Sequence, residues 1–308
     1  MRLVLRSFCV LTMLAAVGGA QTASDPRDAL LVSTAWLEQH LKDPNLTVLF
    51  IGDDNEYKKT HIPGAQNVQM EDFAIEDNSP TGLALEVPPT ETLRNRLGAL
   101  GITDQSRIVV YSGGRMFLAW TTRLLLTLDY AGFGDRTSLL DGGMSAWSKE
   151  HRPVTDVVPP KRTSALGALN VKPVIVNAAF VKSRIGKPGV SIVDARAQAF
   201  YDGVSTGSSG ARKGHIAGAK SIPYTGAFGT DDFARPTAEL QSIFSKAGVA
   251  PGDTVIGYCH IGQQATAMLF AARLLGHPVR LYDGSFQDWS RQPAAEFPVE
   301  LPQGNRKP

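Results

Sequence analysis

One cysteine, Cys259, stands where a predicted strand meets a predicted helix. The segment from Thr254 to Ala272 reads TVIGYCHIGQQATAMLFAA, a β-branched apolar run followed by a short polar loop and an apolar helical run. Open parallel sheets bind their ligands at junctions of this kind. The N–H groups of the loop and of the helix start favour an anion, here a thiolate. We therefore interpret Cys259 as a catalytic nucleophile, with a buried structural cysteine as the alternative.

The polar loop after the cysteine is the predicted substrate-binding segment. Its members are His260, Ile261, Gly262, Gln263 and Gln264. Several N–H groups curled around one sulfur atom stabilise its negative charge without a lysine or an arginine. Adjacency in sequence does not bring the imidazole of His260 to the cysteine sulfur. Two roles therefore stay open for this side chain, contact with the donor or solvent and proton transfer.

Composition argues against several other classes of protein. The 308 residues are 43% hydrophobic and 19% charged, as in a globular chain long enough for two cores. The formal net charge of +2 is too small to indicate a nucleic acid or a membrane surface as partner. The cysteines and histidines are scattered without the spacing of metal ligands. We expect no metal and no cofactor.

The N-terminus has the composition of an export signal. Two arginines precede an apolar run at residues 8–17, and small residues follow, which is the order of a secretory signal peptide. The run is short for a membrane span, although a membrane-anchoring or merely apolar N-terminus is the alternative. We predict a signal peptide at residues 1–20 and an exported chain with no stable membrane span after cleavage. It would be periplasmic in a Gram-negative bacterium and otherwise secreted. Cys9 lies inside this run, so the mature chain would keep Cys259 alone.

The remaining sequence alternates strands and helices. In the first half, strands are predicted at residues 47–51, 107–111 and 138–140, and helices at 30–42, 90–100 and 116–128. In the second half, strands are predicted at 191–194, 254–258 and 279–282, and helices at 238–247 and 264–275. Ser33 or Thr34 is the expected N-cap of the first helix. Alternation of this kind predicts a parallel α/β fold.

The two halves share anchors in the same order, which indicates an internal repeat. The segment THIPGA around His61 is echoed by GHIAGA around His215, and Asp141 recurs 142 residues later as Asp283. The repeat predicts a first domain at residues 28–152, a proline-bearing linker at 153–173 and a second domain at 174–300.

Several of the shared anchors are expected to be structural. The two echoed histidines should hydrogen-bond the backbone of their loops. Trp147 and Trp289 should be core aromatics, and Asp141 and Asp283 should cap or turn the chain.

These motifs resemble those of the tandem-domain rhodanese sulfurtransferases. The segment YKKTHIPGAQNV from Tyr57 to Val68 is similar to the family's first signature, and LDGGMSAW from Leu140 to Trp147 resembles its C-terminal motif. The second half matches more loosely. The resemblance covers nearly all of the mature chain and implies two α/β domains, each a mostly parallel central sheet with helices on both faces. It implies that the first domain, with Ser112 in place of the cysteine, is catalytically silent. The second would be catalytic, with its site opening toward the domain interface.

The resemblance also implies sulfur transfer through a persulfide on Cys259. The sulfur donor would be thiosulfate or 3-mercaptopyruvate, and the acceptor cyanide or a thiol, with a protein thiol as a further candidate partner. A persulfide carrier or sulfur-binding module with little turnover is the second hypothesis. A related phosphatase is disfavoured, because Ala265 stands where that class places its phosphate-binding arginine.

Two positions depart from the family's pattern. Thiosulfate-type members carry cationic residues directly after the cysteine and mercaptopyruvate-type members carry Gly-Ser-Gly, and Ile261 fits neither. Phe200 stands where members often have a substrate-binding arginine. An anionic donor would then depend on the loop N–H groups, with Arg196, Arg212 and Lys213 as candidate substrate-binding residues.

Overall fold

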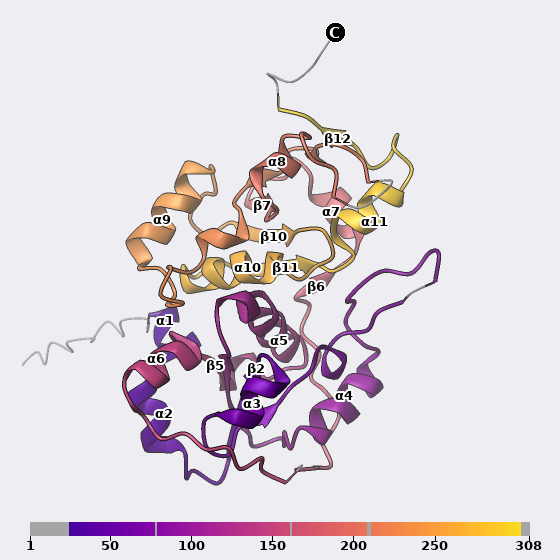
Figure 1. Cartoon of the computed structure of the whole chain (residues 1–308). Helices are drawn as coiled ribbons and strands as arrows, with labels where there is room; N and C mark the ends of the chain where they lie inside the picture. The colour runs from indigo at the N-terminus through magenta and orange to yellow at the C-terminus, as the bar shows by residue number, and fades with distance from the viewer. Residues whose placement is uncertain (1–24, 78, 161, 208–210, 303–308) are drawn as a thin grey trace, which may run out of the picture.

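The computed structural model describes residues 25–302 except 78, 161 and 208–210. The first half of the chain forms the lower α/β domain in Figure 1 and the second half forms the upper one. The predicted signal peptide at residues 1–20 lies outside the described residues. Residues 150–174, between the two domains, contain no named helix or strand in the described part. This linker follows the first domain, where Ser164 N–H donates to the Gly98 carbonyl at 2.9 Å.

The first domain is built on a five-stranded parallel sheet. Its strand order is β1 (Leu31–Val32), β5 (Thr137–Leu140), β4 (Arg107–Ser112), β2 (Leu46–Ile51) and β3 (Gln66–Asn67). One face is covered by α2 (Thr34–His40), α3 (Asp54–Lys59) and α6 (Gly143–Lys149), and the other by α4 (Thr90–Ala99) and α5 (Leu118–Tyr130). The short helix α1 (Pro26–Leu30) and the 3-10 turns η1 (Met70–Asp72), η2 (Arg115–Phe117) and η3 (Gly134–Arg136) complete the domain.

The central strands of this sheet are apolar along their length because both of their faces are buried. Side chains alternate between the faces. Val48 and Phe50 of β2 pack with α2, α3 and α6, whereas Leu49 and Ile51 pack with α4 and α5.

The second domain repeats this plan. Its parallel sheet has the order β6 (Ile175–Val176), β11 (Val279–Tyr282), β10 (Thr254–Tyr258), β7 (Val190–Asp194) and β9 (Lys220–Ser221). Helices α7 (Ala178–Arg184) and α11 (Ser285–Arg291) cover one face, and α9 (Thr237–Lys246) and α10 (Ala265–Leu274) cover the other. The remaining elements are α8 (Gln198–Tyr201), η4 (Tyr224–Gly226) and an antiparallel pair of β8 (His215–Ile216) with β12 (Val299–Glu300). Two parallel sheets, each between helices, confirm the predicted fold class.

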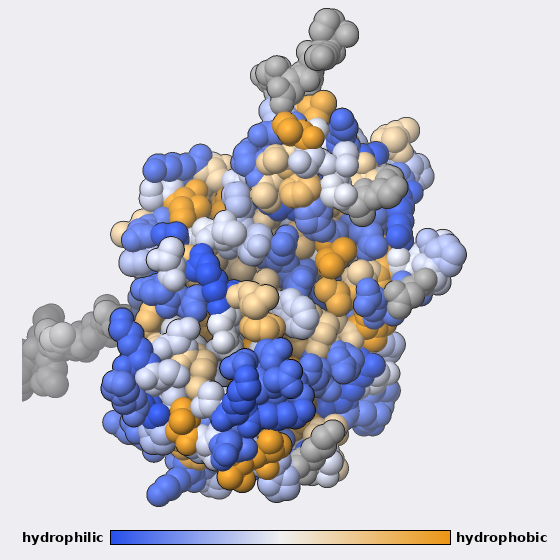
Figure 2. Space-filling view, viewed as in Figure 1, coloured by the Kyte–Doolittle hydropathy of each residue, from blue (hydrophilic) through white to orange (hydrophobic). Residues whose placement is uncertain are grey.

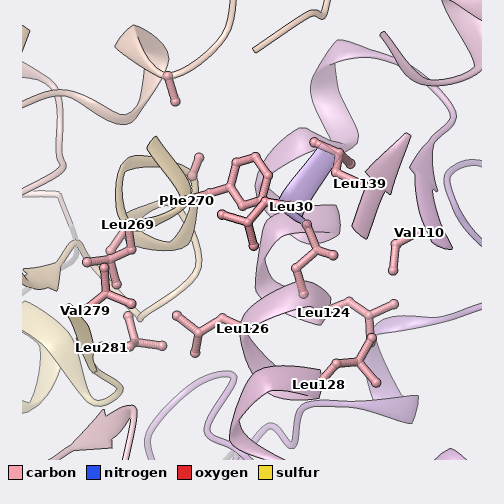
Figure 3. Packing of buried hydrophobic residues seen from close by; sticks show 14 of the residues in the cluster. Leu30, Val110, Leu124, Leu126, Leu128, Leu139, Leu269, Phe270, Val279 and Leu281 are labelled. Atoms are coloured by element: carbon pink, nitrogen blue, oxygen red, sulfur yellow. The ribbon is translucent and has the colours of Figure 1, made fainter. Parts of the chain in front are cut away.

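The two domains share one continuous hydrophobic core. Helices α5 and α10 face each other between the sheets in Figure 1. Figure 3 shows Leu126 of α5 pointing toward Leu281 of the second sheet, while Leu30 lies beside Phe270 of α10. Separating the domains would expose this apolar surface to water, which costs about 25 cal/mol per Å². The shared core therefore fixes the relative position of the two sheets.

One predicted boundary was wrong. Leu31 and Val32 were assigned to a helix but form β1, where they pair with Leu139 and Leu140. Strand pairing across the sheet outweighs their helical spacing. The helix begins after Ser33, whose hydroxyl accepts the Trp36 N–H at 3.1 Å, which confirms the predicted N-cap.

The outer surface in the view of Figure 2 is mixed, with hydrophilic residues gathered over α3. Within the described ranges, no helix has both the length and the apolar character needed to cross a membrane.

Candidate active site

Cys259 lies directly after the central strand of the second sheet. Strand β10 is flanked by β11 and β7, and the cysteine follows its carboxyl end, the edge at which parallel sheets bind ligands. Its side chain is fully buried as a free thiol. The end of the strand is fixed by Tyr258, whose hydroxyl accepts the Ile216 N–H at 3.0 Å and donates to Asp194 at 2.8 Å.

Carbonyl groups of the Cys259 loop, residues 259–264, accept hydrogen bonds from residues outside the loop. Those of Cys259 and His260 accept N–H bonds from Phe286 at 3.0 Å and Gln287 at 2.9 Å, at the start of α11. The Gly262 carbonyl accepts from Arg123 Nη1 at 3.1 Å. The C=O and N–H of a trans peptide point in opposite directions. The following N–H groups are therefore turned away from α11 and from Arg123.

The N–H groups of the same loop are left open. From His260 to Ala265, successive backbone N–H groups have no acceptor among the residues that the structure describes. Gly262 gives the loop its turn with φ at +78°, where a Cβ would lie 2.5 Å from the Asp283 carbonyl. A run of open N–H groups that leads into a helix start is a site for an anion.

Ser285 fixes the backbone of the cysteine itself. Its hydroxyl accepts the Cys259 N–H at 3.2 Å and donates to the Tyr282 carbonyl at 2.8 Å. Its φ of +51° is strained for a residue with a side chain. Gly143 holds the corresponding position in the first domain with φ at +53°. Ser285 was not among the residues predicted from the sequence, although a serine opposite a glycine in the repeat was a usable signal.

The equivalent loop of the first domain, residues 112–117, has a different pattern of hydrogen bonds. Ser112 Oγ donates to the Gly114 carbonyl at 2.5 Å and accepts the Gly114 N–H at 3.1 Å. The N–H of Gly113 donates to the Ile51 carbonyl at 2.7 Å, and that of Phe117 to the Gly114 carbonyl at 2.9 Å. The N–H groups of this Ser112 loop are thus mostly occupied by the domain itself.

His260 packs against the side of the second domain. Its ring meets Phe200 edge to face at 4.5 Å between centroids, and a Cβ on Gly207 would lie 3.1 Å from the ring. Burial, followed by the positive charge of Arg196, lowers the pKa of His260. The imidazole is therefore neutral at pH 7. Phe200 thus supports the loop by packing.

The two loop glutamines face a cavity between the domains. Gln263 and Gln264 line a space of about 440 Å³, together with residues from η2, α5 and η4. Gly262, whose carbonyl binds Arg123, and the half-buried Ile261 do not line this space.

The three predicted cationic helpers are placed apart from this cavity. Arg196 is buried and binds Asp194 through Nε and Nη2, with Nη2 also donating to the Gly214 carbonyl at 2.7 Å. Against desolvation by burial, the hydrogen bond and charge of Asp194 raise the pKa of Arg196. Arg212 donates to the carbonyls of Phe297 and Trp289, and Lys213 is exposed. Arg196 and Arg212 thus serve the protein's own polar groups, and none of the three lines the cavity.

Asp141 and Asp283 stand in the turn and the bend that follow β5 and β11, as expected, and their carboxylates also make contacts that the sequence did not reveal. Asp283 binds the buried Arg123 of α5 at 2.5 Å and accepts the Val87 N–H at 2.8 Å. Asp141 accepts the Ala234 N–H at 2.8 Å. Both aspartates therefore bind backbone of the opposite domain. The one arginine inside an apolar helical run was the available signal for Arg123.

The expected packing of the two tryptophans is confirmed, while the two histidines hydrogen-bond the backbone of α3 and α8 rather than that of their own loops. His61 Nδ1 lies 2.6 Å from the Tyr57 carbonyl, and His215 Nδ1 lies 2.9 Å from the Tyr201 carbonyl. Trp147 and Trp289 are fully buried. These contacts build equivalent frames in the two domains.

A family comparison identifies this repeated architecture. The model of the rhodanese-like domain matches residues 33–150 and again residues 177–292. The chain belongs to the rhodanese family. Each match contains one of the parallel sheets, and the second rhodanese-like domain carries the Cys259 loop.

Curated relatives span most of the chain. The sulfur carrier protein TtuD of Thermus thermophilus is 30% identical over 84% of this chain and 93% of its own length. A probable 3-mercaptopyruvate sulfurtransferase of Pseudomonas aeruginosa is 30% identical over 86% and 96%. The thiosulfate sulfurtransferase of Cricetulus griseus is 30% identical over 87% and 94%. These names are consistent with sulfur transfer through a persulfide.

Solved structures agree in fold. The crystal structure of YnjE superposes with a TM-score of 0.77 at 23% identity, covering 89% of this chain and 68% of that one. Wild-type EanB superposes with a TM-score of 0.76 at 22% identity, covering 90% and 70%. At this identity the likeness concerns the rhodanese fold alone.

Proposed function

We propose that this rhodanese is a sulfurtransferase that works through a persulfide on Cys259. It takes a sulfur atom from thiosulfate or 3-mercaptopyruvate and passes it to cyanide or a thiol. The observation that carries this proposal is the run of open N–H groups from His260 to Ala265 directly after a buried cysteine. Both the thiolate and the persulfide anion gain from such donors.

The first half of the cycle loads the enzyme. With thiosulfate, the Cys259 thiolate attacks the outer sulfur, and the sulfur–sulfur bond of the donor breaks. The bonding electron pair leaves with sulfite, and the cysteine keeps one added sulfur as a persulfide. In the second half the acceptor attacks this outer sulfur, and the electron pair returns to Cys259 as a thiolate.

A non-turnover persulfide carrier is the second candidate. Two observations favour it: one relative is named a sulfur carrier, and Arg196 and Arg212 are engaged by groups of the protein itself. A carrier would load one sulfur and release it only to a specific partner.

We propose in addition that the chain is exported, which the basic and apolar composition of residues 1–20 supports. Expression of the full chain in a Gram-negative host, followed by osmotic-shock fractionation and N-terminal mass analysis, tests this. A periplasmic protein that has lost about 20 residues is expected. An uncleaved cytoplasmic protein would contradict export without affecting the sulfurtransferase proposal.

The enzyme and the carrier are separated by steady-state assays with thiosulfate and with 3-mercaptopyruvate in parallel, each with cyanide as acceptor. An enzyme releases sulfite or pyruvate and thiocyanate for many turnovers. Release that stops after one equivalent per protein would favour the carrier. No release and no loading from either donor would contradict both.

A further inference from the structure

We propose that the first domain carries a binding site of its own, for a small organic cation that also bears a carbonyl group. The site is a cavity of about 650 Å³ beside the edge strand β3, lined by α3, β3, η1, the end of α4 and the linker. It is called here the β3 cavity, and its lining includes Gln66, Asn67, Glu71, Asp72, Leu100 and Val158. The proposal goes beyond sulfur transfer, because none of these residues belongs to the second domain or to the Ser112 loop.

The β3 cavity has the size and the position of a ligand site. Its volume lies within the range of about 300–1,000 Å³ that holds small organic ligands. Figure 1 shows α3 and α4 on the same side of the lower domain, with the linker passing below them. Residues from distant parts of the chain, Lys58 of α3, Leu100 after α4 and Val158 of the linker, therefore meet around one space.

The backbone edge of β3 is already covered. This strand is the last of its sheet, and such an edge can pair with an added peptide strand. The Tyr57 hydroxyl, however, donates to the Ala65 carbonyl at 2.7 Å and also hydrogen-bonds the Asn67 backbone. Because this contact occupies the edge, the β3 cavity fits a small molecule better than an extended peptide.

Two side-chain amides of the β3 cavity have groups that need partners. Gln66 is only 8% exposed, and its buried Nε2 has no acceptor among the residues that the structure describes. Asn67 donates to Asp54 through Nδ2 at 2.8 Å, whereas its buried Oδ1 accepts from no described residue. Buried polar groups of proteins are nearly always hydrogen-bonded. A ligand with one acceptor for Gln66 and one donor for Asn67 would satisfy both.

The charges of the β3 cavity favour a cation. Three carboxylates line it, those of Asp54, Glu71 and Asp72, against the lysine Lys58. Lys58 is already paired with Asp54, while Glu71 is exposed and forms no ion pair with any described residue. The C-terminal end of α4 also lines the cavity, and a helix carries partial negative charge at that end.

The remaining wall of the β3 cavity is apolar. Ala99 and Leu100 stand at the end of α4, and Val158 of the linker is 54% exposed. The ligand class follows from these groups together: an ammonium for the carboxylates, a carbonyl oxygen for Gln66 Nε2 and a short alkyl chain for the apolar wall. Linear amino amides and amino-acid amides have all three features, and their N–H groups also serve Asn67 Oδ1.

Three compounds of similar shape test the two polar ends of such a ligand. The compound 5-aminopentanamide has both ends, hexanamide has a methyl group in place of the ammonium, and 5-methylhexan-1-amine has an isopropyl group in place of the amide. NMR titration of the full chain measures the three dissociation constants. Binding of 5-aminopentanamide should be the tightest, with hexanamide weaker by about tenfold or more and the amine by about three- to tenfold. Equal binding of the three, or no binding of 5-aminopentanamide, would overturn the proposal.

Gln66→Met tests the buried donor, because methionine keeps the length of the side chain and removes its N–H groups. The ratio of the dissociation constants of 5-methylhexan-1-amine and 5-aminopentanamide should fall close to one. Circular dichroism checks that the fold is kept. A folded variant with the wild-type ratio would show that Gln66 does not bind the carbonyl group, against the proposal.

Glu71→Gln tests the charge with little effect on the fold, since this residue is exposed. The dissociation constant of 5-aminopentanamide should rise about threefold, and that of hexanamide should not change. The matched control is Glu76→Gln, at an exposed glutamate outside the β3 cavity, which should leave both constants at their wild-type values. Equal effects of the two substitutions would mean that the cation is bound elsewhere.

Failure of this inference is distinct from failure of the sulfurtransferase proposal, because the β3 cavity lies in the first domain. Cys259→Ser should bind 5-aminopentanamide with the wild-type dissociation constant. Loss of binding in that variant would place the compound at the Cys259 loop and overturn the inference. Sulfur transfer by the wild type is measured separately and does not enter this test.

Discussion

The two domains share a frame but differ in whether the backbone N–H groups of their loops are hydrogen-bonded. In both domains a buried tyrosine stands at the end of the central strand, Tyr111 in the first and Tyr258 in the second. Its hydroxyl accepts a backbone N–H from the HIPGA or HIAGA segment. In the first domain, Ser112 and its neighbours bond to each other. In the second, the carbonyls of the Cys259 loop bind α11 and Arg123. The frame is therefore common, whereas among the described residues the unbroken run of six open donors belongs to the second loop.

A second difference lies beneath the loops. Phe50 pairs with Tyr111 in the first sheet at the register where Asp194 pairs with Tyr258 in the second. The Phe50 ring fills the first site so closely that a Cβ on Gly52 would lie 2.2 Å from it. The second site holds a buried Asp194–Arg196 ion pair instead. The first domain thus has an apolar filling where the second has a buried, hydrogen-bonded ion pair.

The strongest test of this comparison is Cys259→Ser. The substitution is nearly isosteric, so the fold should be retained, whereas sulfur transfer should fall by at least about a thousandfold because a hydroxyl is a poor nucleophile here. Thiocyanate formation and far-ultraviolet circular dichroism measure the two properties. Retained sulfur transfer would remove Cys259 from the site.

The double variant Ser112→Cys with Cys259→Ser sharpens the same point. A cysteine in the first domain should gain no activity, since the Gly113 and Phe117 N–H groups stay bonded to the Ile51 and Gly114 carbonyls. Turnover by the double variant would show that the open N–H groups do not distinguish the two domains.

The next largest effect is expected for Arg123→Met. Removing the guanidinium leaves Asp283 buried without its charge partner, which should cost about 3–5 kcal/mol in the free energy of unfolding. Loss of the contact to the Gly262 carbonyl should also lower the rate of sulfur transfer. Urea unfolding and thiocyanate formation measure both effects.

Arg273→Met is the matched control for Arg123→Met. This residue pairs with Asp129 across the same interface at 3.3 Å but is partly exposed, so it should cost about 1 kcal/mol or less. Equal losses in the two variants would contradict the special weight given to Arg123. Arg123 and Phe270 hold the same position, counted from the starts of α5 and α10. Helix α10 therefore offers Asp141 no arginine at that position.

Exchanging Ser285 and Gly143 gives smaller effects, mainly on activity in Ser285→Gly and on stability in Gly143→Ser. In Ser285→Gly, relief of backbone strain and loss of the hydrogen bond to Cys259 should offset each other to within about 1 kcal/mol. Sulfur transfer should still fall by about tenfold, because the cysteine backbone loses its anchor. In Gly143→Ser the new Cβ would lie 2.8 Å from the Ser112 carbonyl, so the domain should lose about 1–3 kcal/mol. Unchanged kinetics in Ser285→Gly would exclude it as a positioning residue.

The smallest effect concerns pH and His260. Burial, then Arg196, lowers the pKa of this imidazole below its ordinary value of 6.5. As pH falls below 6.5, the unfolded chain takes up the proton before the folded one, so the free energy of unfolding decreases. His260→Gln should remove this part of the slope between about pH 7.5 and 5.5, measured by urea unfolding. An unchanged slope would mean that another group titrates. In the first domain Gly113 stands at the position of His260, so the Ser112 loop has no imidazole at that position.

The sequence predicted the frame of this molecule well for identifiable reasons. The apolar runs ending at Ile51, Tyr111 and Tyr258 carry enough residues to set a strand, and the echoed HIPGA and HIAGA segments mark equivalent turns. The edge strands were not predicted, because two residues such as Gln66–Asn67 carry no periodicity. Leu31 and Val32 were misassigned, since pairing with a strand more than 100 residues away is invisible locally.

The candidate site was predictable only in part. Cys259 and its loop follow from local order along the chain. The partners that hold them come from distant segments: Arg123 from α5, Ser285 from the turn after β11, and Phe200 from α8. Arg196 and Arg212 looked available because the sequence does not reveal which cations are already bound to carboxylates or carbonyls.

The most direct test of the central claim is the mass of the purified chain after incubation with thiosulfate and removal of excess donor. The open loop of the second domain should give one added sulfur, a gain of about 32 Da, on the peptide that contains Cys259. The gain should disappear after treatment with cyanide and be absent in Cys259→Ser. A wild-type chain that transfers sulfur to cyanide while its Cys259 peptide never gains this mass would contradict the persulfide mechanism.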